Sequence, residues 1–131
     1  MSERMPAIFI GHGSPMNAVE NNQYTEQWIK AAAKMKKPEV ILAVSAHWYT
    51  SGTRITDSPR PNVVYDMYGF PPSLYDIAYQ PEGAPALAKE IQRLIGQDNV
   101  AIDNTWGIDH GTWSVLCRMY PHADIPALQL S

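Results

Sequence analysis

Residues 40–47 read Val-Ile-Leu-Ala-Val-Ser-Ala-His, and this stretch decides the fold class. Its first five residues are apolar and rich in β-branched side chains, which favours a buried strand. A second apolar run, residues 7–10, is followed by Gly11 and predicts another strand. Strands buried on both faces have continuous apolar sequences, so we expect these two to be parallel neighbours.

A helix is predicted between the two apolar runs. Tyr24, Trp28, Ala32 and Met35 recur at helical spacing, whereas lysines and a glutamate occupy the other faces. Pro38 should end this helix, because proline cannot continue the hydrogen-bond ladder. Strand, helix and strand in this order predict a right-handed crossover unit.

The rest of the chain predicts an alternation of helices and strands. The expected elements are a helix over 85–95 ended by Gly96, a strand over 100–102, a helix over 112–120 and a strand over 125–130. In the helix over 85–95, we expect Leu87, Ile91, Leu94 and Ile95 to point inward. The proline-rich stretch 59–85 predicts a long ordered loop. The fold class is therefore α/β, with a largely parallel sheet flanked by helices.

Composition excludes several classes of function. The 131 residues suit one domain, and 10 basic against 13 acidic side chains give a net charge of -3 without any charged block, so we expect no nucleic-acid partner. Cys117 is the single cysteine and cannot form an internal disulfide, which indicates a reducing, cytoplasmic location. The first apolar run stops at Ile10, too early for a signal peptide or a membrane span.

Two histidines follow the two apolar runs. His12 comes just after residues 7–10, and His47 ends the stretch 40–47. Ligands collect at the carboxyl ends of parallel strands, and neighbouring strands lie about 4.8 Å apart, so the two imidazoles could bind one metal ion. The alternative is that each is an ordinary polar loop residue. Ser14 does not fit a nucleophile elbow, because Pro15 follows it directly.

A third histidine, His110, stands just before a predicted helix. The helix dipole favours a neutral imidazole there, and such a ring can take up or release a proton near a bound phenol. The alternative is a histidine that only forms hydrogen bonds at the helix start. His122, in a turn beside Pro121, is given no role.

Aromatic residues lie near these histidines in the sequence. The segment 65–72 could form a rigid wall for a flat substrate, or it could simply pack a loop onto the core. Trp48, Trp106 and Trp113 could likewise surround a water-poor pocket or serve only as packing residues.

Five segments occur in the order of a known family, and they are residues 5–17, 44–48, 69–71, 106–113 and 120–126. Together they resemble the DODA-type, LigB-like extradiol dioxygenases, relatives of the class III ring-opening enzymes that cleave DOPA and similar catechols. The resemblance runs along the whole chain but covers only about the first half of a typical member. We therefore expect residues 1–131 to be the N-terminal portion of a single catalytic domain, and an incomplete one.

The resemblance implies roles for the three histidines. His12 and His47 would be metal ligands, His110 would line the substrate side of the pocket, and the family's remaining ligands would lie in its later half. The implied reaction uses O2 and a non-haem divalent metal to open a catechol to a semialdehyde. Fe(II) suits this chemistry because it can change oxidation state, whereas Zn(II) cannot, although it binds imidazole more tightly.

Two other functions remain open from the sequence. The same two histidines could hold a water-activating zinc in a hydrolase or deacylase. The chain could also be a non-catalytic fragment that associates without turnover. Because nothing follows the predicted strand 125–130 to cover it, we expect self-association or a need for a further polypeptide.

Overall fold

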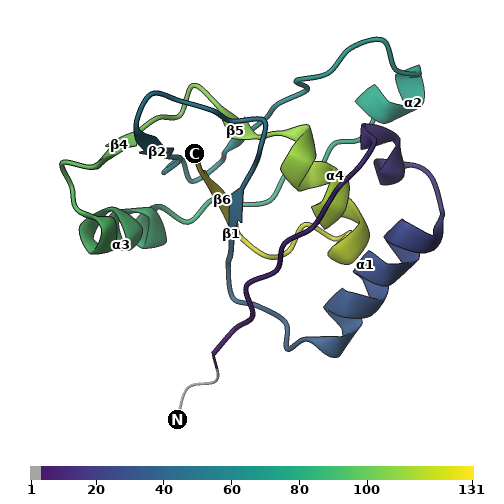
Figure 1. Cartoon of the computed structure of the whole chain (residues 1–131), viewed down its shortest axis with the longest axis horizontal. Helices are drawn as coiled ribbons and strands as arrows, with labels where there is room; N and C mark the ends of the chain where they lie inside the picture. The colour runs from purple at the N-terminus through teal and green to yellow at the C-terminus, as the bar shows by residue number, and fades with distance from the viewer. Residues whose placement is uncertain (1–3) are drawn as a thin grey trace.

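The computed structural model describes residues 4–131 and has a four-stranded sheet at its centre (Figure 1). The strands are β1 (Ile41–Val44), β6 (Ala127–Leu130), β2 (Thr53–Ile55) and β4 (Val100–Ile102), in that spatial order. β1 is parallel to β6 and β2 is parallel to β4, whereas β2 and β6 meet antiparallel at a single residue pair. The largely parallel α/β sheet is thus confirmed.

Helices cover the two faces of this sheet (Figure 1). α3 (Pro85–Ile95) packs on one face, and α4 (His110–Met119) packs on the other, with α1 (Gln23–Lys34) outside α4. Successive residues of a strand point to opposite faces. Accordingly, Leu128 of β6 belongs to the cluster beneath α3, and its neighbour Ala127 belongs to the cluster beneath α4.

The short elements surround the α4 side. They are the 3-10 helix η1 (Pro15–Ala18), α2 (Pro72–Tyr75) and a parallel pair formed by β3 (Asn62–Val63) and β5 (Gly107–Ile108). β3 and α2 are separated by irregular segments, so the predicted loop over 59–85 is only briefly interrupted by regular structure.

Local sequence signals explain the helix ends. The Asn22 side chain accepts hydrogen bonds from the backbone at the start of α1, while the Thr25 hydroxyl accepts from the Asn22 backbone, which forms a capping box. Gly96 ends α3 at φ +115°, a conformation that side chains disfavour. Helix α1 ends at Lys34, before the predicted stop at Pro38.

The predicted strand over residues 7–10 is wrong. This segment has no regular structure, Phe9 is 99% exposed, and a groove of about 710 Å3 separates the segment from β1. A strand persists only through a ladder of hydrogen bonds to a neighbour, and within residues 4–131 β1 pairs with β6 instead. The predicted parallel pair and its crossover are therefore also absent from the described residues.

Two predictions about burial are wrong as well. We expected the last strand to lie uncovered, but β6 is buried between β1 and β2. The exposed apolar edge is that of β1, where Val44 is 70% exposed. In α3, Leu94 and Ile95 were expected to point inward but are exposed, because only Leu87, Ala88 and Ile91 reach the sheet.

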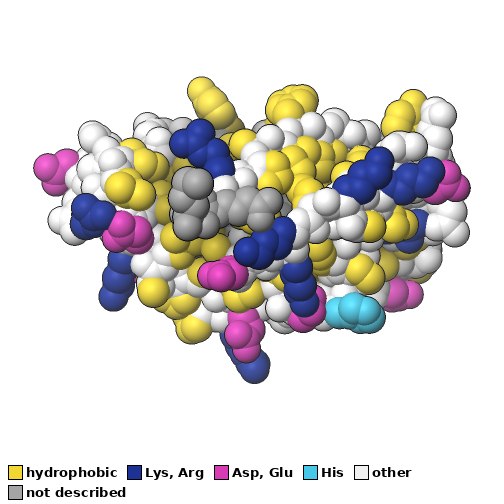
Figure 2. Space-filling model, turned by 90° about the horizontal axis from the view of Figure 1, so that it is seen from below, with side chains coloured by type: hydrophobic (Ala, Val, Ile, Leu, Met, Phe, Trp, Pro, Cys, Tyr) yellow, Lys and Arg dark blue, Asp and Glu magenta, His cyan; other side chains and the backbone are white. Residues whose placement is uncertain are grey.

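Charges of both signs are mixed on the face of the molecule that Figure 2 shows. On the face drawn in Figure 2, basic and acidic side chains alternate around exposed apolar patches, without a large area of one sign. Among residues 4–131, no helix is long and apolar enough to cross a membrane.

Candidate metal centre

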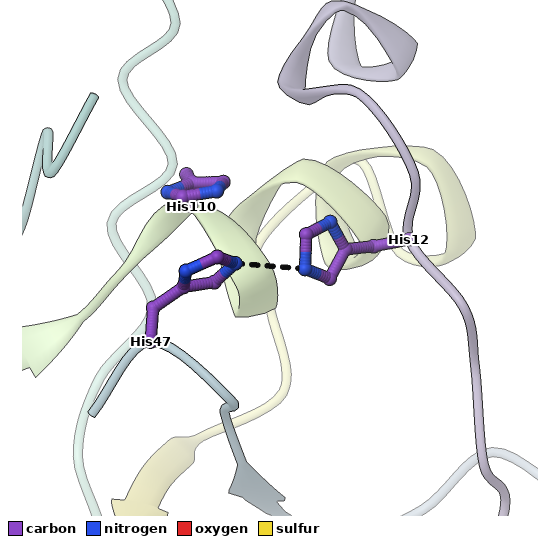
Figure 3. A group of neighbouring side chains, drawn as sticks. All are labelled: His12, His47 and His110. Atoms are coloured by element: carbon purple, nitrogen blue, oxygen red, sulfur yellow. Dashed lines mark hydrogen bonds between the residues drawn. The ribbon is translucent and has the colours of Figure 1, made fainter. Parts of the chain in front are cut away.

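Three imidazoles from distant parts of the chain meet at one edge of the sheet (Figure 3). His12 comes from the segment before η1, His47 from the loop after β1, and His110 from the first turn of α4. One nitrogen from each ring lies within 4.8 Å of the others. The structure therefore brings His12 and His47 together, although the strand pairing from which we expected this is wrong.

His12 is aimed by its own turn and by η1. Its Nδ1 lies 2.9 Å from the carbonyl oxygen of Gly13, which can only accept, so Nδ1 carries the hydrogen and Nε2 keeps its lone pair. The buried side chain of Asn17 donates to the His12 carbonyl at 3.0 Å. Burial lowers the pKa of His12, the Gly13 carbonyl opposes this shift, and nearby His47 and His110 add to it. A neutral ring with a free Nε2 suits a metal ligand.

His47 lies directly over the start of α4. Its Nε2 is 2.9 Å from His12 Nε2, and its ring centroid is 4.0 Å from that of His110. Gly111 makes this approach possible, since a Cβ added there would lie 2.9 Å from Cδ2 of His47 and 2.6 Å from Oγ of Ser45. The glycine is thus a steric requirement of the site.

His110 is buried and is oriented by Asp66. The Asp66 carboxylate accepts the His110 backbone N–H at 3.0 Å, and the same oxygen lies 2.8 Å from Nδ1 of the ring. The ring contact is close enough for an ion pair but lies off the line of a hydrogen bond. Burial by itself would raise the pKa of Asp66, but its contacts with the side chain and backbone of His110 hold that pKa below its usual value.

The sequence of the chain matches that of a known protein family. Residues 6–131 match the model described as the catalytic LigB subunit of aromatic ring-opening dioxygenase. The chain belongs to the LigB family. This confirms the resemblance seen in the sequence.

Named relatives of this LigB-family chain agree with that result. It is 50% identical over 131 residues to a protein of Escherichia coli K12 named 4,5-DOPA dioxygenase extradiol, covering 99% of this chain and 48% of that protein. It is 40% identical over 130 residues to a protein of the same name from Beta vulgaris, covering 95% of this chain and 48% of that one. The chain therefore spans about half the length of these relatives.

A solved structure shares the fold. The crystal structure of an uncharacterized protein from Escherichia coli K12 superposes with a TM-score of 0.77 at 44% identity, covering 98% of this chain and 47% of the other. The α/β architecture of this LigB-family chain is therefore that of an experimentally known protein over nearly its whole length.

The histidine cluster fits the donor set that a divalent transition metal requires. Imidazole nitrogens suit iron and zinc alike. Nε2 of His12 and Nε2 of His47 lie 2.9 Å apart, so both nitrogens are placed where they could hold a single ion.

The aromatic residues near the histidines have mixed roles. Trp113 is fully buried and donates to the Val64 carbonyl, so it serves the core. Trp48 is also buried. In the segment 65–72, Phe70 packs on the core while Tyr68 is 91% exposed. The packing alternative therefore accounts for most of these side chains.

Sequence reasoning missed the polar residues that hold the histidines in place. Asn17, Ser45, Asp66, Asp109 and Gln129 form these contacts. Two of them left a signal. Asp109 is a residue type that favours helix N-caps and stands shortly before the predicted helix 112–120; it caps α4, which begins earlier than predicted, at His110. Gln129 is a lone polar residue inside an apolar strand, where a buried partner is needed.

Proposed function

We propose that this chain carries part of the active site of an extradiol dioxygenase that opens catechol rings, with DOPA or a similar catechol and O2 as its substrates. The observation that supports this most directly is the meeting of three imidazoles at one sheet edge in a chain of the LigB family. Family membership favours this function over the zinc hydrolase or deacylase that the histidines alone would also suit.

In this proposal His12 and His47 hold one divalent metal, and the domain is the N-terminal portion of a single catalytic domain. The two donors would be Nε2 of His12, which carries a lone pair because Nδ1 holds the hydrogen, and Nε2 of His47, 2.9 Å away. Fe(II) is the ion expected for activity, because it can pass electron density from a bound catecholate to O2. Zn(II) is expected to compete for the same nitrogens, and that form should be inactive.

His110 is proposed to act on the substrate. It is buried at the N-terminus of α4, and the Asp66 carboxylate beside Nδ1 orients its ring. An imidazole so placed can exchange a proton with a catechol hydroxyl. Because its nitrogen also lies within 4.8 Å of the other two, the competing assignment is that His110 is a third metal ligand.

Metal content tests the site. We would load wild type, His12→Ala and His47→Ala anaerobically with Fe(II), desalt them and measure bound metal by elemental analysis. Replacing either ligand should abolish or strongly reduce stoichiometric binding. His122→Ala is the matched control, because His122 is an exposed histidine outside the cluster. Undiminished stoichiometry in both ligand variants, with the circular dichroism spectrum unchanged, would refute the assignment.

Oxygen uptake tests the reaction. Ring cleavage consumes O2 in the presence of DOPA or catechol, whereas a hydrolase consumes none. We expect the chain alone to turn over slowly if at all, since His12 and His47 supply fewer than the three protein ligands usual at catalytic metals. Rapid iron-dependent uptake by the 131-residue chain would contradict this expectation and show that these residues suffice.

A further inference from the structure

Beneath the histidine cluster lies a buried carboxylate that contacts none of the three rings by a hydrogen bond. Asp109 is fully buried, and its two oxygens accept four hydrogen bonds. Oδ1 accepts from the Ser45 hydroxyl at 2.7 Å and from the Gly111 backbone at 2.9 Å. Oδ2 accepts from the Trp106 indole at 2.9 Å and from the Gln129 amide at 3.0 Å.

One branch of this network leads to His47. The Ser45 hydroxyl that donates to Asp109 also accepts the backbone N–H of His47 at 3.1 Å. Ser45 is itself buried, so water cannot readily replace either bond. The loop after β1 is therefore attached to the carboxylate at the point where it presents His47.

A second branch leads to His110, and a third to the sheet. Asp109 precedes His110 and caps α4 by accepting the Gly111 N–H, so it fixes the first turn from which the His110 side chain projects. Gln129 of β6 binds Asp109 twice, because its amide donates to Oδ2 and its carbonyl oxygen accepts the Asp109 N–H. One carboxylate thus connects two histidine-bearing segments with the central strand.

We infer that Asp109 is a positioning residue that holds His47 and His110 in register and thereby sets the metal affinity of the cluster. This inference rests on the proposed metal site. Partners that orient ligands from outside the coordination sphere typically change metal affinity about 10- to 100-fold when they are replaced. Asp109 acts in this way through Ser45 on one side and through the first turn of α4 on the other.

Asp109→Asn tests the inference with almost no change in volume. The NH2 group of the asparagine would face hydrogen-bond donors in either orientation of the amide. In place of Oδ1 it would face Ser45 and Gly111, and in place of Oδ2 it would face Trp106 and Gln129. The hydroxyl of Ser45 can turn, but the backbone and indole N–H groups cannot accept. At least one donor is left unpaired, and the cluster should loosen.

The measurement is the dissociation constant of Co(II) for the full chain, by calorimetry and by its visible absorption bands. Only conditions in which circular dichroism shows the variant folded are used. We expect binding about 10- to 100-fold weaker in Asp109→Asn than in wild type. Asp103→Asn is the matched control, because Asp103 also accepts from its own loop, through Thr105, but forms no bond to this network. Its Co(II) affinity should be unchanged.

Ser45→Ala provides a second test if Asp109→Asn does not fold. It removes only the branch to His47 and leaves the cap of α4 intact, so we expect weaker Co(II) binding with a small change in melting temperature. Affinities within twofold of wild type in every folded variant of Asp109 and Ser45 would overturn the inference while leaving the metal site standing. Failure of wild type to bind Co(II) would overturn the proposed site and this inference together.

Discussion

Replacing Gly111 by alanine should displace His47 from its partners. The added Cβ would lie 2.9 Å from Cδ2 of His47, whereas two carbons are most stable at about 3.5 Å or more. The ring must therefore move by about 0.6 Å, and Ser45, whose Oγ would lie 2.6 Å away, must move as well. Functional sites tolerate displacements of only about 0.5 Å, so metal affinity should fall by about 10-fold or more.

The effect of Gly111→Ala on folding should be smaller, because two contributions oppose each other. Alanine in place of glycine favours a helix by about 1 kcal/mol, whereas overpacking a filled site costs about 1–3 kcal/mol. The free energy of unfolding should therefore fall by about 0–2 kcal/mol. The signature of the variant is a large loss of metal affinity with a modest loss of stability.

Urea unfolding and Co(II) titration measure the two quantities on the same samples. Gly11→Ala is the matched control, since Gly11 adjoins His12 but a Cβ there would meet nothing within 4 Å. A Gly111→Ala protein that is more stable than wild type and binds Co(II) equally well would refute the reasoning. That result would mean that His47 does not pack against the start of α4.

Three further predictions concern other parts of the molecule. In a catalytically complete form, His110→Ala should keep its metal and lose about 10²-fold in turnover, measured by oxygen uptake beside elemental analysis; loss of the metal would make His110 a ligand. Burial raises the pKa of the Cys117 thiol to about 11, so at pH 8 only about one thiol in a thousand is ionised. Iodoacetamide should therefore label Cys117 far more slowly in the folded protein than in the unfolded protein, with the rates measured by mass spectrometry. Equal rates would contradict the burial of the Cys117 thiol. Val44→Lys should reduce self-association in light scattering, because a charge would then stand on the exposed apolar edge of β1, and an unchanged particle size would point to another surface.

Elements whose sequence pattern and packing agree were predictable. Helices α1 and α3 carry apolar stripes and end signals, and β4 and β6 are short apolar runs with neighbours to pair with. Residues 7–10 have the same kind of apolar sequence as β1, yet only β1 has a strand beside it. An apolar run shows which residues a strand could bury but does not show which strand would pair with it. For this reason the prediction of a strand over residues 7–10 was wrong.

The candidate site was predictable in its residues but not in its geometry. His12 and His47 were recognised by their positions after apolar runs, and His110 by its place before a helix. That His110 lies 4.0 Å from His47, centroid to centroid, depends on α4 packing against the loop after β1, a contact between segments 63 residues apart in the sequence. The role of Asp109 depends on the same packing, since its partners Ser45 and Gln129 come from two different strands or their ends.

The irregular segment before η1 has a thermodynamic consequence for the site. Among the described residues, His12 is the one member of the cluster that precedes every helix and strand. Ordering the backbone of one residue costs about 1–2 kcal/mol. Any residue around His12 that becomes ordered only when the metal binds therefore reduces the free energy of metal binding by that cost. This coupling is reciprocal. The bound ion stabilises the ordered form of residues 7–13 by the same free energy by which ordering of these residues strengthens metal binding. Protection of the backbone amides of this segment from hydrogen exchange should therefore rise with metal concentration. The exchange rate of the N-terminal segment would then report the fraction of metal sites that are filled.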